Sequence, residues 1–245
     1  MHRKNGPAIV YTNGGFCWYR NGRKHRDGDE PAECNRDGVL RWFKNGKLHR
    51  IGAPACIRPQ ETIYDIKFEW YENDKLHRED GPAVEFYDGC EKWYRNGKLH
   101  RDNDLPAVTS LQGLKEWWVN GKKHRESGPA EISSSGSQTW YLNDKLHRKD
   151  APACIHPDGR FEWYLNGRMH REDGPACFMS ATNSYSWHIK GVLQTELQVK
   201  RRIKKLGLKN LASEAKVIYA PEPPKLKKLD IWRPNPSGDV ISFKF

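Results

Sequence analysis

The chain has 245 residues, with 42 Lys and Arg against 31 Asp and Glu, and its formal net charge is +11. Charged residues make up 30% of it, above the usual content of about 25%, which leaves too little apolar material for one thick globular core. Ten Trp, ten Tyr and eight Phe exclude a disordered chain, because disordered segments are depleted in aromatic residues. We therefore expect a thin, elongated structure whose core is built from aromatic side chains.

The cysteines and the first residues bear on the compartment. The chain starts without the apolar stretch of a secretory signal, and its six Cys show no Cys-x-x-Cys spacing. We expect an intracellular, non-secreted protein in a reducing compartment, with neither a zinc ribbon nor a redox motif.

An internal repeat accounts for most of the chain, and Trp marks it. Successive Trp of the repeat are 23 or 24 residues apart, except for one interval of 28. Seven of them are followed after seven residues by a His-Arg pair and then by Pro-Ala. The repeated Trp are Trp18, Trp42, Trp70, Trp93, Trp117, Trp140, Trp163 and Trp187. Repetition at this period indicates an array of small stacked units.

Turn signals predict that each unit is a β-hairpin unit. Asn-Gly occurs at 21–22, 45–46, 96–97, 120–121 and 166–167, and it is the strongest short hairpin signal. Asn-Asp at 73–74 and 143–144 can take the same positive-φ turn. We expect two main strands and a short Lys-Leu-His-Arg segment in each unit. Because one unit cannot bury its aromatic face alone, stacked units should form a long antiparallel ribbon.

The units Trp70–His77 and Trp93–His100 (WYENDKLH and WYRNGKLH) resemble the variant form of the MORN repeat. The resemblance covers residues 1–194. It implies an all-β ribbon of about 23-residue units. The His-Arg-x-Asp-Gly-Pro-Ala pattern is similar to repeats in proteins of giant DNA viruses and in bacterial antitoxin-like proteins. This similarity implies a binding role or a structural role in a virion or capsid.

The C-terminal fifth differs from the repeats. We expect a β-hairpin repeat domain over 1–194, a basic helical cap over 195–220 and a Pro-rich extended tail over 221–245. Thr195 and Gly207 are typical of the start and stop of a first helix, and a shorter helix over 208–216 should follow. If the first helix closes the ribbon, Leu197 and Ile203 should pack against the last hairpin.

Two sets of residues in this region are candidates for binding. The basic helix face can bind nucleic acid, an anionic membrane or an acidic protein groove, or it is a solvated cap. The aromatic tail offers anchors for another protein. The candidate residues are Arg201, Arg202, Lys204 and Lys205 for an anionic partner, and Trp232, Phe243 and Phe245 for protein docking.

The repeated His, Arg and Trp have structural explanations that we prefer. His at one position per unit is typical of a hydrogen bond to a neighbouring turn, or of packing on the next unit's Trp, rather than of clustered metal ligands. The Arg beside it has acidic neighbours, which favours Arg–carboxylate pairing over phosphate binding. The Trp should form the thin core rather than stack on bases, although one of Trp117 and Trp118 could be an exposed contact.

No nucleophile–base pair, phosphate-binding loop or zinc signature is present in the sequence, so we expect no catalysis, no cofactor and no small-molecule substrate. The leading hypothesis is a non-catalytic scaffold or protein-interaction protein, structural or assembly-related in a large DNA virus particle. Alternatives are an adaptor that binds nucleic acid or an anionic membrane through the basic helix, and an antitoxin-like module that blocks another protein.

Overall fold

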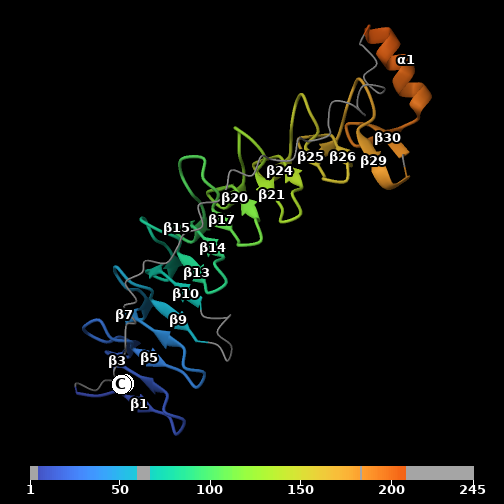
Figure 1. Cartoon of the computed structure of the whole chain (residues 1–245). Coiled ribbons are helices and arrows are strands. Elements are labelled where there is room, and N and C mark those ends of the chain that lie inside the picture. Colours follow the sequence, from blue (N-terminus) through green and yellow to red (C-terminus); the bar gives the residue numbers. More distant parts are fainter. Residues whose placement is uncertain (1–4, 60–66, 183, 208–245) are drawn as a thin grey trace.

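The computed structural model describes residues 5–59, 67–182 and 184–207. These residues form a long, curved ribbon that is built almost entirely from hairpins and ends in a helix (Figure 1). The expectation of an elongated, mainly antiparallel β structure is therefore confirmed.

One antiparallel sheet runs the length of the ribbon. Within the described residues it has 17 strands, and each strand pairs with the sheet strand that precedes it in the chain. In order along the sheet they are β1 (Ile9–Val10), β2 (Phe16–Cys17), β5 (Glu33–Cys34), β6 (Leu40–Arg41), β9 (Cys56–Arg58), β10 (Lys67–Glu69), β13 (Val84–Phe86), β14 (Glu91–Lys92), β17 (Val108–Thr109), β18 (Lys115–Glu116), β21 (Glu131–Ile132), β22 (Gln138–Thr139), β25 (Cys154–Ile155), β26 (Phe161–Glu162), β29 (Cys177–Met179), β30 (Ser184–Ile189) and β31 (Val192–Gln194).

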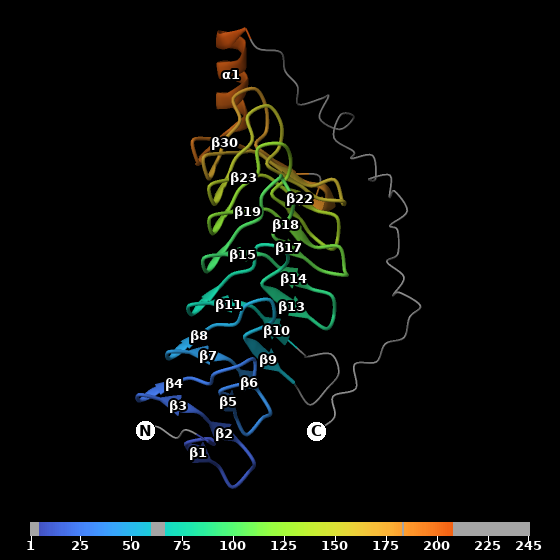
Figure 2. The ribbon, with the colours of Figure 1, turned by 90° about the vertical axis from the view of Figure 1, so that its left-hand side faces the viewer.

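A second row of strands lies beside this sheet, in short hairpins that we call the side hairpins. Figure 2 shows them one above another along one side of the ribbon. In the described part of the chain they are β3 (Tyr19–Arg20) with β4 (Arg23–Lys24), β7 (Phe43–Lys44) with β8 (Lys47–Leu48), β11 (Tyr71–Glu72) with β12 (Lys75–Leu76), β15 (Tyr94–Arg95) with β16 (Lys98–Leu99), β19 (Trp118–Val119) with β20 (Lys122–Lys123), β23 (Tyr141–Leu142) with β24 (Lys145–Leu146), and β27 (Tyr164–Leu165) with β28 (Arg168–Met169).

The side hairpins correct one detail of the sequence interpretation. We expected two main strands and a short Lys-Leu-His-Arg segment per unit. Instead, the Lys-Leu pair is itself a strand, and it pairs with the strand that follows the Trp, as β16 does with β15. Each complete unit thus has four short strands in two layers, with the Trp at the bend between them.

The turns of the side hairpins behave as their sequences predict. Asn96 has a φ of 51° and Gly97 a φ of 79°, which is the pair of positive values that a type I′ turn requires. In the Asn-Asp version, Asn73 and Asp74 take φ values of 50° and 67°. The Asn-Gly and Asn-Asp predictions are confirmed.

Main-chain hydrogen bonds lock each unit onto its neighbour. The Gly97 N–H donates to the carbonyl of Leu76, at 2.8 Å, and the Gly121 N–H does the same to Leu99. A second bond runs from the Arg101 N–H to the carbonyl of Trp118 in the next unit, at 3.4 Å. Successive side hairpins are therefore held in a fixed register rather than attached loosely to the sheet.

The core is thin and contains one column of fully buried alanines. The Ala of each Pro-Ala pair has no exposed surface: Ala32, Ala55, Ala83, Ala107, Ala130, Ala153 and Ala176 are all 0% exposed. The repeated Trp lie beside them. Trp42, Trp117 and Trp163 are buried and the other five are half-buried.

The ribbon changes at its C-terminal end. β30 pairs with β29 through its first half and with β31 through its second, so Trp187 continues a strand instead of standing at a bend. Helix α1 (Glu196–Leu206) follows. The Thr195 hydroxyl accepts the Gln198 N–H at its start, and Gly207 has a φ of 65° at its end.

The packing expected for this helix is partly wrong. Leu197 is 58% exposed and Leu193 is 66% exposed, because α1 continues beyond the last hairpin instead of lying on it (Figure 1). The side chain of Ile203, the predicted helix over 208–216 and the tail over 221–245 lie outside the described residues. None of the helices that the structure describes is long and apolar enough to cross a membrane.

Candidate interaction surfaces

Six of the seven repeated His side chains bind the turns of neighbouring units, and the exception is His49, whose Nδ1 is buried without a hydrogen-bond partner among the residues that the structure describes. The His25 Nδ1 accepts the main-chain N–H of Asn45, 20 residues later in the chain, at 2.9 Å. The same bond recurs along the array from Asn96 to His77, Asn120 to His100, Asn143 to His124, Asn166 to His147 and Lys190 to His170. This is one of the two structural roles that the sequence left open, and it occupies the Nδ1 of each of these rings.

Two of these imidazoles also contact an Asp through Nε2. The distances are 2.9 Å from His25 to Asp27 and 2.8 Å from His100 to Asp102. The hydrogen bond with the imidazole holds the pKa of each Asp below its usual value, helped by a neighbouring Arg. Both carboxylates are therefore committed to fixing the ring. Within the described residues, no group of three His, Cys, Asp or Glu could hold a metal ion.

The Arg that follows each His lies on the Trp ring of its own unit. The guanidinium carbon is 3.8 to 4.3 Å from the ring centroid in all seven units. Its Nη1 donates to the carbonyl of the unit's own Pro, as Arg101 does to Pro106 at 3.1 Å. Burial lowers the pKa of Arg101. This planar contact is the repeated feature that sequence reasoning missed, although the constant Trp-to-Arg spacing was a signal for it.

Carboxylates pair with several of these Arg, as expected, but not in every unit in the same way. The Arg50 Nε lies 2.6 Å from Asp29 of the preceding unit, and Arg125 reaches back to Asp104 in the same manner. The Arg171 Nε instead meets Asp173 of its own loop at 2.7 Å. Each of these guanidinium groups thus stacks on a Trp ring, and several also pair through an edge nitrogen with a carboxylate. They are therefore poorly placed to bind phosphates.

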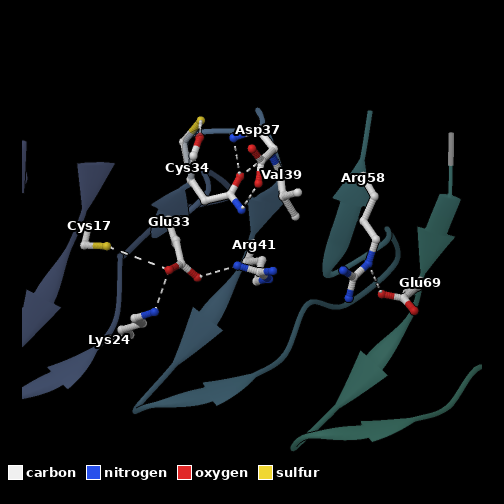
Figure 3. Close-up of polar contacts among 10 residues, drawn as sticks. Cys17, Lys24, Glu33, Cys34, Asp37, Val39, Arg41, Arg58 and Glu69 are labelled. Atoms are coloured by element: carbon white, nitrogen blue, oxygen red, sulfur yellow. Dashed lines mark hydrogen bonds and ion pairs between the residues drawn. The ribbon is translucent and has the colours of Figure 1, made fainter. Parts of the chain in front are cut away.

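Charged clusters replace apolar contacts at some points between the two layers. Glu33 accepts from Lys24 of a side hairpin at 2.6 Å and from Arg41 of the sheet at 3.1 Å (Figure 3). Glu69, 3% exposed, is held by Arg58 and Lys67. Burial alone would raise the pKa of Glu69, but these bonds lower it. Each carboxylate therefore stays charged as part of the core.

Three of the six cysteines are buried, namely Cys17, Cys56 and Cys154, and the other three are half-buried. All six are free. Burial raises the pKa of Cys154 to about 12 and also raises that of Cys56, so the thiolate that reacts is scarce at either position.

A groove between two neighbouring His-Arg loops is a recess at which another protein could dock. It has a volume of about 520 Å³, and Arg50, Ile51, Tyr71 and His77 are among its lining residues. Ile51 is 82% exposed at its edge. An apolar side chain this exposed is suited to contact with a partner.

The predicted anionic-partner residues occupy one short helix. Arg201, Lys204 and Lys205 are exposed on α1, while the side chain of Arg202 lies outside the described part of the chain. Trp232, Phe243 and Phe245 are also outside it. Trp117 is buried, and Trp118 is half-buried with its Nε1 donating to Glu116 at 3.0 Å, so neither is the exposed contact that we considered.

The sequence was also compared with known proteins. No protein-family model matches the chain, and no curated protein sequence matches it.

Proposed function

We propose that this chain is a non-catalytic scaffold that presents a stiff, repeated surface to other proteins. The observation that carries the proposal is the use of the His-Arg pairs: the His holds the next unit's turn, and the Arg covers the Trp of its own unit. The side chains best suited to chemistry thus maintain the ribbon. The groove beside Ile51 is the docking surface that we favour.

A structural or assembly role in a large DNA virus particle is the concrete version of this proposal, and the resemblance of the repeats to MORN variants supports it. An antitoxin-like role, in which the ribbon blocks another protein, relies on the same resemblance and would use the same surface.

A second candidate is an adaptor for nucleic acid or an anionic membrane. The exposure of Arg201, Lys204 and Lys205 on α1 supports it. Contacts of this kind depend on counterion release, so they weaken by orders of magnitude between about 50 and 200 mM salt.

The test is to purify the native assembly at about 50 mM and at about 200 mM salt. The proteins that co-purify with the full chain are compared with those that co-purify with an Ile51→Asp variant. A scaffold should keep its protein partner at both concentrations and lose it in the variant, because a charge in a docking groove is costly to bury. Leu111→Asp is the matched control, since Leu111 is 77% exposed and far from the groove in sequence. Partner loss with salt alone, or equal loss in both variants, would contradict the proposal.

A further inference from the structure

A row of basic side chains runs along the turns of the side hairpins, and we call it the basic ridge. Its members occupy the same position in every side hairpin, the residue directly after the two turn residues. They are Arg23, Lys47, Lys75, Lys98, Lys122, Lys145 and Arg168. All seven are exposed, and in the described part of the chain none is within ion-pair distance of a carboxylate.

The fold does not require a charge at this position. The aliphatic stem of each residue has a packing role, since a Cβ on Gly97 would lie 3.7 Å from the Lys75 Cβ, but an uncharged side chain could pack in the same way. The residue directly opposite in each side hairpin is freely variable. In chain order it is Arg20, Lys44, Glu72, Arg95, Val119, Leu142 and Leu165.

Three side hairpins even keep two like charges face to face, in the pairs Arg20–Arg23, Lys44–Lys47 and Arg95–Lys98. Lys44 is directly opposite Lys47, both are exposed, and such a pair destabilises a hairpin. Two turns carry an acid, since Asp74 and Asp144 accept the N–H groups of Leu48 and Lys123, but the five Asn-Gly turns of the other side hairpins carry none. The positive charges of the basic ridge are therefore suited to an anionic ligand.

The spacing and rigidity of the ridge identify the ligand. Each unit adds two strands to the sheet, so neighbouring ridge residues are about 10 Å apart and the whole row is about 58 Å long. A long, regular row of charges suits a stiff polyanion with closely spaced charges. Duplex DNA carries one charge per about 1.7 Å of axis and stays straight over about 150 base pairs, so ordering it costs little.

Single-stranded nucleic acid fits less well. Proteins that bind it offer aromatic rings on which bases stack. The aromatic residues of the side hairpins, such as Tyr94 and Tyr141, are half-buried on the side that faces the sheet, opposite to the ridge.

We propose that the basic ridge binds the phosphate backbone of duplex nucleic acid without reading its sequence. This proposal is independent of the scaffold function and of helix α1. The ridge residues act as point charges at regular intervals, and binding should therefore depend steeply on salt and little on base composition.

The test is titration of the full chain with a fluorescent DNA duplex of about 30 base pairs, which is longer than the ridge. The ridge variant combines Lys98→Glu, Lys122→Glu and Lys145→Glu. The matched control combines Arg36→Glu, Lys115→Glu and Lys149→Glu, which are exposed positions off the ridge and give the same change in net charge. A third variant reverses Arg201, Lys204 and Lys205 on α1.

We expect the ridge variant to lose at least tenfold in affinity and to reduce the slope of log affinity against log salt by about 3, one per lost phosphate contact. The control and the α1 variant should change both quantities less. Circular dichroism must show an unchanged fold in all three. Absence of duplex binding, equal losses in the ridge and control variants, or a loss confined to the α1 variant would overturn the proposal. So would ridge-dependent binding of polyglutamate or phosphatidylserine vesicles without binding of the duplex.

Discussion

The alanine of each Pro-Ala pair shows how little space a single residue has in this ribbon. Ala107 is 0% exposed, its N–H donates to the carbonyl of Glu116, and its carbonyl accepts the N–H of Trp93. The main chain is therefore held on both sides of the methyl group, and a larger side chain cannot be accommodated by a shift of the backbone.

We predict that Ala107→Leu lowers the free energy of unfolding by about 1 to 3 kcal/mol, the usual cost of overpacking. Urea denaturation followed by Trp fluorescence measures it. Ala181→Leu, at an exposed position, is the control and should change stability by no more than about 0.5 kcal/mol. Equal effects of the two substitutions would mean that the alanine column is not tightly packed.

The Arg on the Trp ring makes a second prediction at this scale. Arg101→Met keeps most of the stem but removes the cation 3.8 Å from the Trp93 ring and the donor to Pro106. The free energy of unfolding should fall by about 1 to 3 kcal/mol, because the substitution removes both a charged hydrogen bond and a cation–π contact. Arg36→Met, on an exposed loop, should leave the urea midpoint nearly unchanged. If Arg101→Met left the free energy of unfolding unchanged, the contact of Arg101 with Trp93 would not contribute to stability.

Sequence reasoning identified these positions but not their contacts. The spacing of Trp93, His100 and Arg101 establishes that they are equivalent from unit to unit. It does not establish that the guanidinium turns back onto its own Trp, because acidic neighbours such as Asp102 offer a competing partner of equal plausibility.

At the scale of the element, the side hairpin was predicted where its turn dominates the local sequence. Asn-Gly specifies a type I′ turn with little help from the rest of the chain. The assignment of the hairpin to its own layer was missed, because the strand Lys98–Leu99 is two residues long and two residues show no periodicity. The same limit applies to α1: its amphipathic pattern identified a face around Leu197 but not whether anything covers that face.

The two kinds of turn predict a difference between substitutions of Gly97. Gly97→Ala should cost about 1 kcal/mol, because its φ of 79° is unfavourable for an L side chain while the space around it is adequate. Gly97→Asp should cost less, since Asp74 takes that position in another unit and accepts a main-chain N–H from the preceding side hairpin. Thermal unfolding of both variants shows which of the two is the more stable. An Asp variant less stable than the Ala variant would contradict this reading of the turn.

At the scale of the whole molecule, the ribbon is a one-dimensional stack. Residues contact their own unit and the next, as the bonds from Gly97 to Leu76 and from Arg101 to Trp118 show. In the described units the core is a column of buried alanines beside the repeated Trp, which explains how a chain with 30% charged residues folds without a thick core. Composition therefore predicted the shape, while the order of strands followed from the repeat.

This shape gives the last prediction, which concerns small-angle X-ray scattering of the full chain. A compact protein of 245 residues has a radius of gyration of about 18 Å. Seventeen strands at about 4.8 Å make a sheet about 77 Å long, and a thin rod of that length has a radius of gyration of about 22 Å. We expect a value of at least about 22 Å and a distance distribution with a long tail, because the width of the ribbon only adds to it. A symmetric distance distribution with a radius of gyration near 18 Å would mean that the units fold back on one another, and the extended basic ridge would then not exist in solution.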